Sequence, residues 1–316
     1  MLQSGRPTGC PFFLEFYVDL NLVHIVFEVT TDNPPALLPQ LYDTVRRFDG
    51  YFKSINCSQA DLSCQLCREQ SALCAYRSVF GQFLSVDPDI LRRHQKPPLP
   101  FAFRIRENAY TSSCIELGIV IVGNAIQHMS MFQRAINLMV ASVASNSGMD
   151  VAVSGTWSVD YQGGRHEFNA PSHSLTLLSG PEIIESTQYS DVVRICFDSP
   201  LRLISAGSIV HSFDFALLLR SQLRRCSSLF AYYGEGELEL DYVYMSDAAK
   251  RVTCIENSFR FTKPQWTQRA GLAGMLGSGE FTDLTDGMLP LLMLGSYLNA
   301  GKGAAFGMGV YRLEEM

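Results

Sequence analysis

The chain has 316 residues, of which 47% are apolar and 18% charged, with a formal net charge of −6. This composition excludes an intrinsically disordered protein, and the length suits two ordinary domains or one large one. No window approaches the roughly 18 uninterrupted apolar residues of a membrane-spanning helix, and the N-terminus lacks the pattern of a signal peptide. We therefore expect a cytoplasmic protein with no membrane partner.

Strands and helices alternate along the first half of the chain. Apolar runs at 22–29 and 115–123 predict buried strands. Apolar residues spaced three and four apart over 38–55 predict one helix. The remaining predicted elements are a strand at 101–105, a helix at 132–143 and an edge strand at 151–161.

The second half repeats this order. It predicts a strand at 192–197, a helix at 213–233, strands at 238–245 and 253–261, a helix at 287–300 and a strand over 306–314. Each half approximates strand-helix-strand-strand-helix-strand, so the predicted fold is α+β with two tandem ferredoxin-like (RRM-like) βαββαβ modules. The predicted modules are residues 1–165, with a cysteine-containing insertion at 57–74, and residues 185–316, with a glycine-rich loop at 301–309; residues 162–189 form the connection.

The negative net charge argues against a nucleic-acid partner, but association depends on local charge, and the basic residues are grouped. The groups are Arg46, Arg47 and Lys53; Arg92, Arg93 and Lys96; and Arg220, Arg224 and Arg225. A basic group of this kind can bind phosphates. The alternative for each group is an ordinary solvated face.

The strongest local motif follows the predicted helix at 287–300. It contains Gly301, Lys302, Gly303, Phe306, Gly307 and Gly309. Glycines allow successive backbone amides to approach an anion, and lysine adds a mobile cation, so the run predicts a phosphate-binding loop. A nucleotide-binding P-loop is excluded because its GxxxxGK[ST] pattern is absent. The alternative is a structural hairpin.

Four of the nine cysteines fall within one short stretch, at Cys57, Cys64, Cys67 and Cys74. Four thiolates spaced C-x6-C-x2-C-x6-C can close a tetrahedral site, and C-x2-C is common in zinc knuckles. Zinc is the leading candidate, an iron–sulfur cluster is the second, and unliganded cysteines are the third. Because the set lacks an open position for water, we expect a structural metal.

The C-terminal motif resembles the signature of the RAMP superfamily, and more narrowly of the CRISPR-associated endoribonucleases that process precursor guide RNA, the sixth Cas family. The residues that carry the resemblance are Pro290-Leu291-Leu292, Leu294-Gly295, Gly301-Lys302-Gly303, Phe306-Gly307-Met308-Gly309 and Tyr311. Nearly the whole chain follows the family's order of elements. The resemblance implies binding to CRISPR repeat RNA (crRNA), with other CRISPR-associated proteins as further partners.

The resemblance also implies metal-independent cleavage, in which a ribose 2′-hydroxyl attacks the adjacent phosphate and leaves 2′,3′-cyclic phosphate and 5′-hydroxyl ends. Such chemistry needs a base, an acid and a cation. Our candidates are His24 and His128, with Lys53 or Lys302 as the cation; a reaction without histidine stays open. The glycine-rich loop with Arg46, Arg47, Arg220 and Arg224 would bind the RNA. The alternative function is a non-catalytic RAMP subunit that binds guide RNA in an effector complex.

Overall fold

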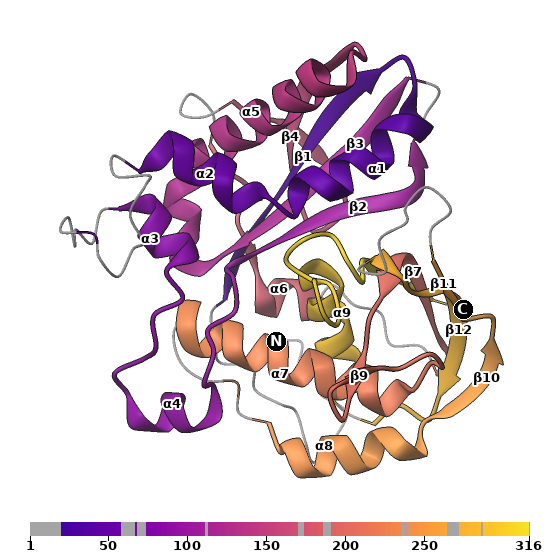
Figure 1. Cartoon of the computed structure of the whole chain (residues 1–316). Coiled ribbons are helices and arrows are strands. Elements are labelled where there is room, and N and C mark those ends of the chain that lie inside the picture. Colours follow the sequence, from indigo (N-terminus) through magenta and orange to yellow (C-terminus); the bar gives the residue numbers. More distant parts are fainter. Residues whose placement is uncertain are drawn as a thin grey trace, which may run out of the picture.

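The computed structural model describes residues 20–57, 67, 74–110, 113–169, 174–185, 191–234, 238, 240–263, 272–285 and 287–315. Within these ranges the chain forms two antiparallel sheets with helices packed on them, which confirms the mixed α/β class. Figure 1 shows the sheet of the first half in the upper part of the molecule and the sheet of the second half below it. No helix in the described ranges is long and apolar enough to cross a membrane.

The first sheet has the strand order β2-β3-β1-β4-β5, with β6 pairing to β1. Its strands are β1 (Asn21–Thr31), β2 (Phe101–Tyr110), β3 (Cys114–Val122), β4 (Val151–Val159), β5 (Arg165–Glu167) and β6 (Leu178–Ser179). The helices of this half are α1 (Pro34–Val45), α2 (Phe48–Asn56), α3 (Ala75–Phe80), α4 (Pro88–Arg93), the 3-10 helix η1 (Gly123–His128), α5 (Met129–Ser147) and α6 (Gly180–Glu185).

The two faces of the first sheet have different partners. Successive side chains of a strand point to opposite faces. On β1, Val23, Ile25 and Phe27 therefore pack into the core that α1, α2 and α5 complete. Leu22 faces the other way and belongs to the core of the second half. The residues between, including His24, thus face the second half of the chain.

The second sheet has the order β10-β12-β7-β13, with β11 pairing to β12. Its strands are β7 (Val193–Leu201), β10 (Thr253–Asn257), β11 (Arg260–Thr262), β12 (Gly274–Thr282) and β13 (Tyr311–Glu315), and β8 (Ile204–Ser205) with β9 (Ser208–Ile209) forms a separate hairpin. The helices are α7 (Phe215–Tyr233), α8 (Tyr242–Ala248), the 3-10 helix η2 (Ala249–Arg251) and α9 (Met288–Leu298). Ile195, Phe197 and Tyr311 join the core with α7 and α9.

The glycine-rich loop connects the two halves. The amide of Phe103 on β2 donates to the carbonyl of Ala305 at 3.0 Å, and Phe103 and Phe306 form an isolated parallel bridge. The buried side chain of Asn299 donates to the carbonyls of Phe103 (2.7 Å) and Ala304 (2.9 Å). The loop therefore extends the β2 edge of the first sheet, and Figure 1 shows it between the upper and lower parts.

Several predicted elements differ from the structure. The helix expected at 38–55 is two helices, because Arg47 leaves the helical conformation and turns the chain. After this turn the ring of Phe48 packs edge-on against Phe103 and stacks on Phe132. The strand expected at 238–245 is wrong, because Asp241 caps a helix by accepting from the amide of Tyr244 at 2.8 Å.

Two further boundaries also differ. The strand expected at 253–261 is interrupted at Ser258, whose hydroxyl donates to the carbonyl of Ser278 at 2.9 Å, so it forms the separate strands β10 and β11. The connection expected at 162–189 contains β5 and β6, which pair with β4 and β1. The first sheet therefore extends past residue 165.

Candidate nucleic-acid interface

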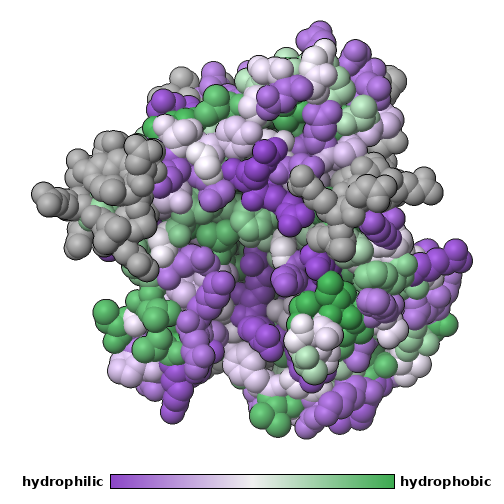
Figure 2. All heavy atoms as spheres, in the orientation of Figure 1, coloured by the Kyte–Doolittle hydropathy of each residue, from purple (hydrophilic) through white to green (hydrophobic). Residues whose placement is uncertain are grey.

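A groove of about 530 Å³ lies along α7, beside the start of the glycine-rich loop. Helical spacing places Leu217, Arg220, Ser221, Arg224, Arg225 and Ser228 on the face of α7 that lines it. The opposite face of the helix carries Leu218, Leu219, Leu223 and Cys226 into the core. The amphipathic pattern of α7 therefore fixes which arginines reach the groove. Figure 2 shows hydrophilic residues around the hollow in the middle of this face.

The lining of this basic groove is strongly positive. Its cations are Lys96, Arg202, Arg220, Arg224, Arg225 and Lys302, and none of the described lining residues is Asp or Glu. Lys96, Arg220, Arg224 and Lys302 are exposed, and no described carboxylate pairs with them. Local potential, not net charge, decides where an anion binds, so the overall charge of −6 does not weaken this surface.

Arg225 has a different role from its neighbours. Its Nε donates to the carbonyl of Leu298 at 2.7 Å, and its Nη2 donates to the carbonyl of Phe101 at 3.3 Å. Burial lowers the pKa of Arg225 to about 10, so the guanidinium remains charged at neutral pH. The side chain thus fixes α7 against the end of α9 and the start of β2 and contributes its charge to the floor of the groove.

The opposite wall of the groove is formed by residues 202–206, which include β8, and β9 pairs with β8 outside the lining. The amide of Lys302 donates to the carbonyl of Arg202 at 2.8 Å, which joins this wall to the glycine-rich loop. Burial lowers the pKa of Arg202, and the positive charge of Arg46, at the end of α1, lowers it further. Arg46 itself lies outside the groove lining.

The glycine-rich loop is largely structural, and its predicted role as a nest of free amides needs correction. The amides of Lys302, Phe306, Met308 and Gly309 all donate to carbonyls of the protein. Gly307 is buried beside Ile105 and Tyr42, with a φ of +84°. These amides are unavailable to a phosphate, so the loop can contribute to the groove through Gly301 and Lys302.

The remaining loop residues and Arg47 lie outside the groove lining. Gly303 is half-buried against Met308. A side chain at Gly309 would bring its Cβ to 2.0 Å from the carbonyl oxygen of Ala300. Phe306 is half-buried and packs edge-on against Phe101. Arg47 is exposed and its Nε donates to the carbonyl of Asp43 at 3.3 Å.

The structure does not bring the predicted catalytic residues into one cluster. The ring of His24 is edge-on to that of Tyr297 on α9, with centroids 6.3 Å apart. Lys53 lies on α2, 5.7 Å above the ring of Tyr76, on the helix-covered side of the first sheet. His128 ends η1, and its buried Nε2 has no hydrogen-bond partner among the described residues. None of the three lines the groove.

The electrostatics of the two histidines favour their neutral forms. Burial, followed by the charges of Arg104, Arg106 and Arg165, holds the pKa of His24 well below its usual 6.5. Burial also lowers the pKa of His128. Arg104 donates to the carbonyl of Ser296 and therefore belongs to the contact between the two halves. Both histidines are thus packed groups that remain uncharged at neutral pH.

The cysteine cluster lies partly outside the described residues. Cys64 is among the residues that the structure does not describe, and Cys57, Cys67 and Cys74 are half-buried. Cys57 ends α2 and Cys74 precedes α3, and these two helices pack together. This helix packing joins the two sides of the insertion, but the described Cys57, Cys67 and Cys74 do not come together as a ligand set. No metal-ligand group is found within the described residues.

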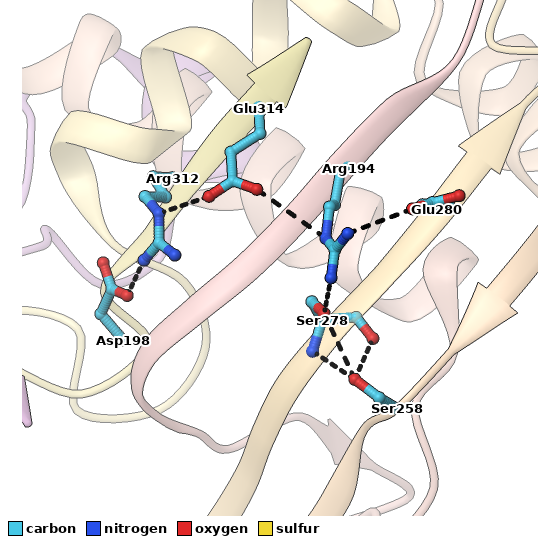
Figure 3. A network of polar contacts seen from close by, with 7 residues as sticks. All are labelled: Arg194, Asp198, Ser258, Ser278, Glu280, Arg312 and Glu314. Carbon is cyan, nitrogen blue, oxygen red and sulfur yellow. Dashed lines mark hydrogen bonds and ion pairs between the residues drawn. The ribbon is translucent and has the colours of Figure 1, made fainter. Parts of the chain in front are cut away.

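The outer face of the second sheet contrasts with the basic groove (Figure 3). Arg194 pairs with Glu280 at 3.3 Å and with Glu314 at 3.8 Å. Arg312 pairs with Glu314 at 2.9 Å and also with Asp198. The arginines on this face are thus already neutralised by carboxylates, so the face is a poor competitor for a polyanion.

Sequence reasoning found part of the groove. Gly301, Lys302, Arg220 and Arg224 were predicted, and the structure brings them together from two distant segments. Arg202 was missed, because a single arginine after a strand carries no local signal. Its place in the groove depends on the hairpin that follows it and on the contact with Lys302.

An antiparallel α/β fold and a groove with six cations and no carboxylate in its described lining provide a surface that suits a polyanion. Two family models match parts of the chain. Residues 195–311 match the family model for the CRISPR-associated endoribonuclease Cas6. Residues 20–174 match a model described as an N-terminal domain. The Cas6 match covers less than half of the chain, so the second half is similar to the Cas6 endoribonucleases.

Solved structures share the fold over nearly the whole chain. A Cas6 product complex aligns with a TM-score of 0.57 at 14% identity, covering 93% of this chain and 100% of that one. Cas6 of Thermus thermophilus aligns at 0.53 and 13% identity, covering 93% and 99%. A partial Cas6-RT-Cas1–Cas2 complex aligns at 0.57 and 12% identity, covering 96% of this chain and 47% of that one. A comparison with curated proteins gives no match.

Proposed function

We propose that this chain binds CRISPR repeat RNA in the basic groove and cleaves precursor crRNA there. The single observation that supports this proposal is the row of exposed Lys96, Arg220, Arg224 and Lys302 with no carboxylate in the described lining. Such a row can follow successive phosphates of one strand. Along the chain, each half approximates the order strand-helix-strand-strand-helix-strand. This order and the antiparallel sheet of each half support tandem ferredoxin-like modules.

The proposed reaction is an internal transesterification. The 2′-oxygen of a ribose forms a bond to the adjacent phosphorus, and the bond from phosphorus to the 5′-oxygen of the next nucleotide breaks. The 2′-hydroxyl loses its proton and the leaving 5′-oxygen gains one, which gives a 2′,3′-cyclic phosphate and a 5′-hydroxyl. No oxidant or second reactant is needed. The extra charge on the phosphate oxygens is the feature that the protein must stabilise.

We assign this stabilisation to Lys302 and Arg202, which the hydrogen bond between their backbones holds together on one wall. His24, His128 and Lys53 lie outside the groove lining, so we propose no role for them in the reaction. Charge stabilisation and in-line positioning of the 2′-oxygen then account for the rate, with protons exchanged with solvent. Removing one such donor typically costs about 100- to 1000-fold in rate.

The test is single-turnover cleavage of a labelled repeat RNA in EDTA. Wild-type protein should cut at one position, and a 2′-deoxy nucleotide at the attacking position should prevent cutting while binding persists. Lys302→Ala should slow cleavage about 100-fold, whereas His24→Ala and His128→Ala should retain it. A need for added magnesium, or cutting of the deoxy RNA, would contradict the mechanism. Binding without cleavage by the wild type would instead favour a guide-RNA subunit of an effector complex.

We also propose that the cysteine cluster binds one structural zinc ion. The packing of α2, which Cys57 follows, on α3, which Cys74 precedes, supports a site that pins the insertion, with Cys64 and Cys67 as the other ligands. Thiolates bound to zinc would hold the segment without any part in RNA cleavage. Other CRISPR-associated proteins are the proposed protein partners, in keeping with the match of residues 195–311 to the Cas6 model.

A further inference from the structure

An exposed aromatic pair lies next to the hairpin whose strand β8 forms part of one wall of the basic groove. The ring of His211 stacks on that of Phe261 in β11, with centroids 4.1 Å apart and planes 25° from parallel. His211 is exposed, whereas Phe261 is half-buried. A parallel stack of this kind leaves the imidazole available for a second planar group.

The hairpin connects this pair to the groove. Ile204 and Ser205 of β8 line the groove and pair with Ile209 and Ser208 of β9, which continues directly to His211. The amide of Val210, next to His211, donates to the carbonyl of Leu203 in the groove wall at 3.0 Å. Figure 1 shows β9 in front of α7, below the glycine-rich loop. The aromatic pair thus continues the wall along which the RNA strand would lie.

The pair is held on a rigid base. Phe213, two residues after His211, stacks on Phe259 with centroids 4.0 Å apart and planes 15° from parallel. Both rings contact the buried Phe281. Phe259 and Phe261 lie on either side of Arg260 at the β11 edge. The backbone on both sides of the His211–Phe261 pair is therefore fixed by core packing, so the pair is preorganised for a ligand.

We propose that His211, supported by Phe261, stacks on one nucleobase of the bound RNA and sets the register of the strand in the groove. This inference rests on the proposed function. Unstacked bases in single-stranded RNA bind to aromatic and histidine side chains, and one such stack contributes about 1–3 kcal/mol. Phosphate contacts in the groove carry no sequence information, so they cannot select one register of the RNA strand. A base stacked on His211 at the end of the groove would select that register.

The test measures the affinity of the full chain for a cognate repeat RNA and for a set of RNAs that each carry one abasic nucleotide. His211→Ala should weaken binding to intact RNA by roughly 5- to 150-fold, and His211→Phe should retain it. One abasic position should weaken wild-type binding by a similar factor and have no further effect on His211→Ala. His166→Ala, which removes an exposed histidine on β5, should bind as the wild type does.

The outcomes separate this inference from the function on which it rests. One outcome is that wild-type protein binds repeat RNA and that Lys302→Ala weakens this binding, whereas His211→Ala does not. That result would contradict the base stack and would leave the assignment of the RNA to the groove intact. If every abasic position adds its full effect to His211→Ala, or if His211→Phe binds as poorly as His211→Ala, the stack is also wrong. If the wild type does not bind repeat RNA, both proposals fail. Equal melting temperatures for the variants exclude unfolding as the cause of lost affinity.

Discussion

Removing two cations from the basic groove should change the salt dependence of RNA binding by a calculable amount. Four exposed cations line the groove, Lys96, Arg220, Arg224 and Lys302. If each contacts one phosphate of single-stranded RNA, log K should fall with log salt with a slope of about −0.7 × 4, or −2.8. Affinity would then fall about 50-fold between 50 and 200 mM salt. The double variant Arg224→Gln, Lys302→Gln should have a slope of about −1.4 and a loss of about 7-fold.

The assay is fluorescence anisotropy of a labelled repeat RNA across a salt series. A matched control changes the same net charge elsewhere. Lys250 and Arg251 are exposed on η2 and do not line the groove, and Lys250 pairs with Asp247 at 2.7 Å. The double variant Lys250→Gln, Arg251→Gln should keep the wild-type slope. If the two double variants reduce the slope equally, binding depends on overall charge and the groove assignment is refuted.

Three further predictions concern stability. Gly309→Ala should lower the melting temperature, since the residue has a φ of +63° and its Cβ would lie 2.0 Å from a backbone oxygen, whereas Gly50→Ala in α2 meets nothing within 4 Å and should be neutral or stabilising. Because the folded-state pKa of His24 lies below 6.5, the folded chain binds fewer protons than the unfolded chain in acid. The free energy of unfolding should therefore fall as the pH drops below about 6.5, by at most about 1.4 kcal/mol per pH unit. Denaturant titrations at several pH values should show that His24→Gln flattens this dependence. Elemental analysis should find about one zinc per wild-type chain, with Cys64→Ser lowering zinc content and melting temperature and Cys254→Ser changing neither; absence of zinc from the wild type would contradict the site.

The fold class was predictable because each half has strong local patterns. Two-sided apolar runs marked β1 and β3, and the spacing of apolar residues marked α5 and α7. Local patterns failed where tertiary contacts decide the conformation. Residues 242–248 have strand-forming aromatic and β-branched side chains, yet the Asp241 cap and the buried Met245 and Ala248 make them a helix.

The site was harder to predict, because it assembles from segments whose separation in sequence hides their proximity. The glycine motif pointed to the right segment, but pattern alone could not show that its amides donate to protein carbonyls such as those of Gly303 and Arg202. Histidine is the usual acid or base in metal-independent cleavage, which favoured His24. The alternation of β1 places His24 against Tyr297, outside the groove lining.

Ultraviolet cross-linking of the wild-type chain to bound repeat RNA, followed by mass spectrometry of the peptides, tests the central claim most directly. We predict cross-links in peptides that contain 202–206, 217–228 and 301–302, the three segments that supply most of the groove lining. We predict few cross-links at the paired arginines of the outer sheet face, Arg194 and Arg312. Cross-links concentrated on that outer face, with none along α7, would contradict the placement of the RNA in the groove.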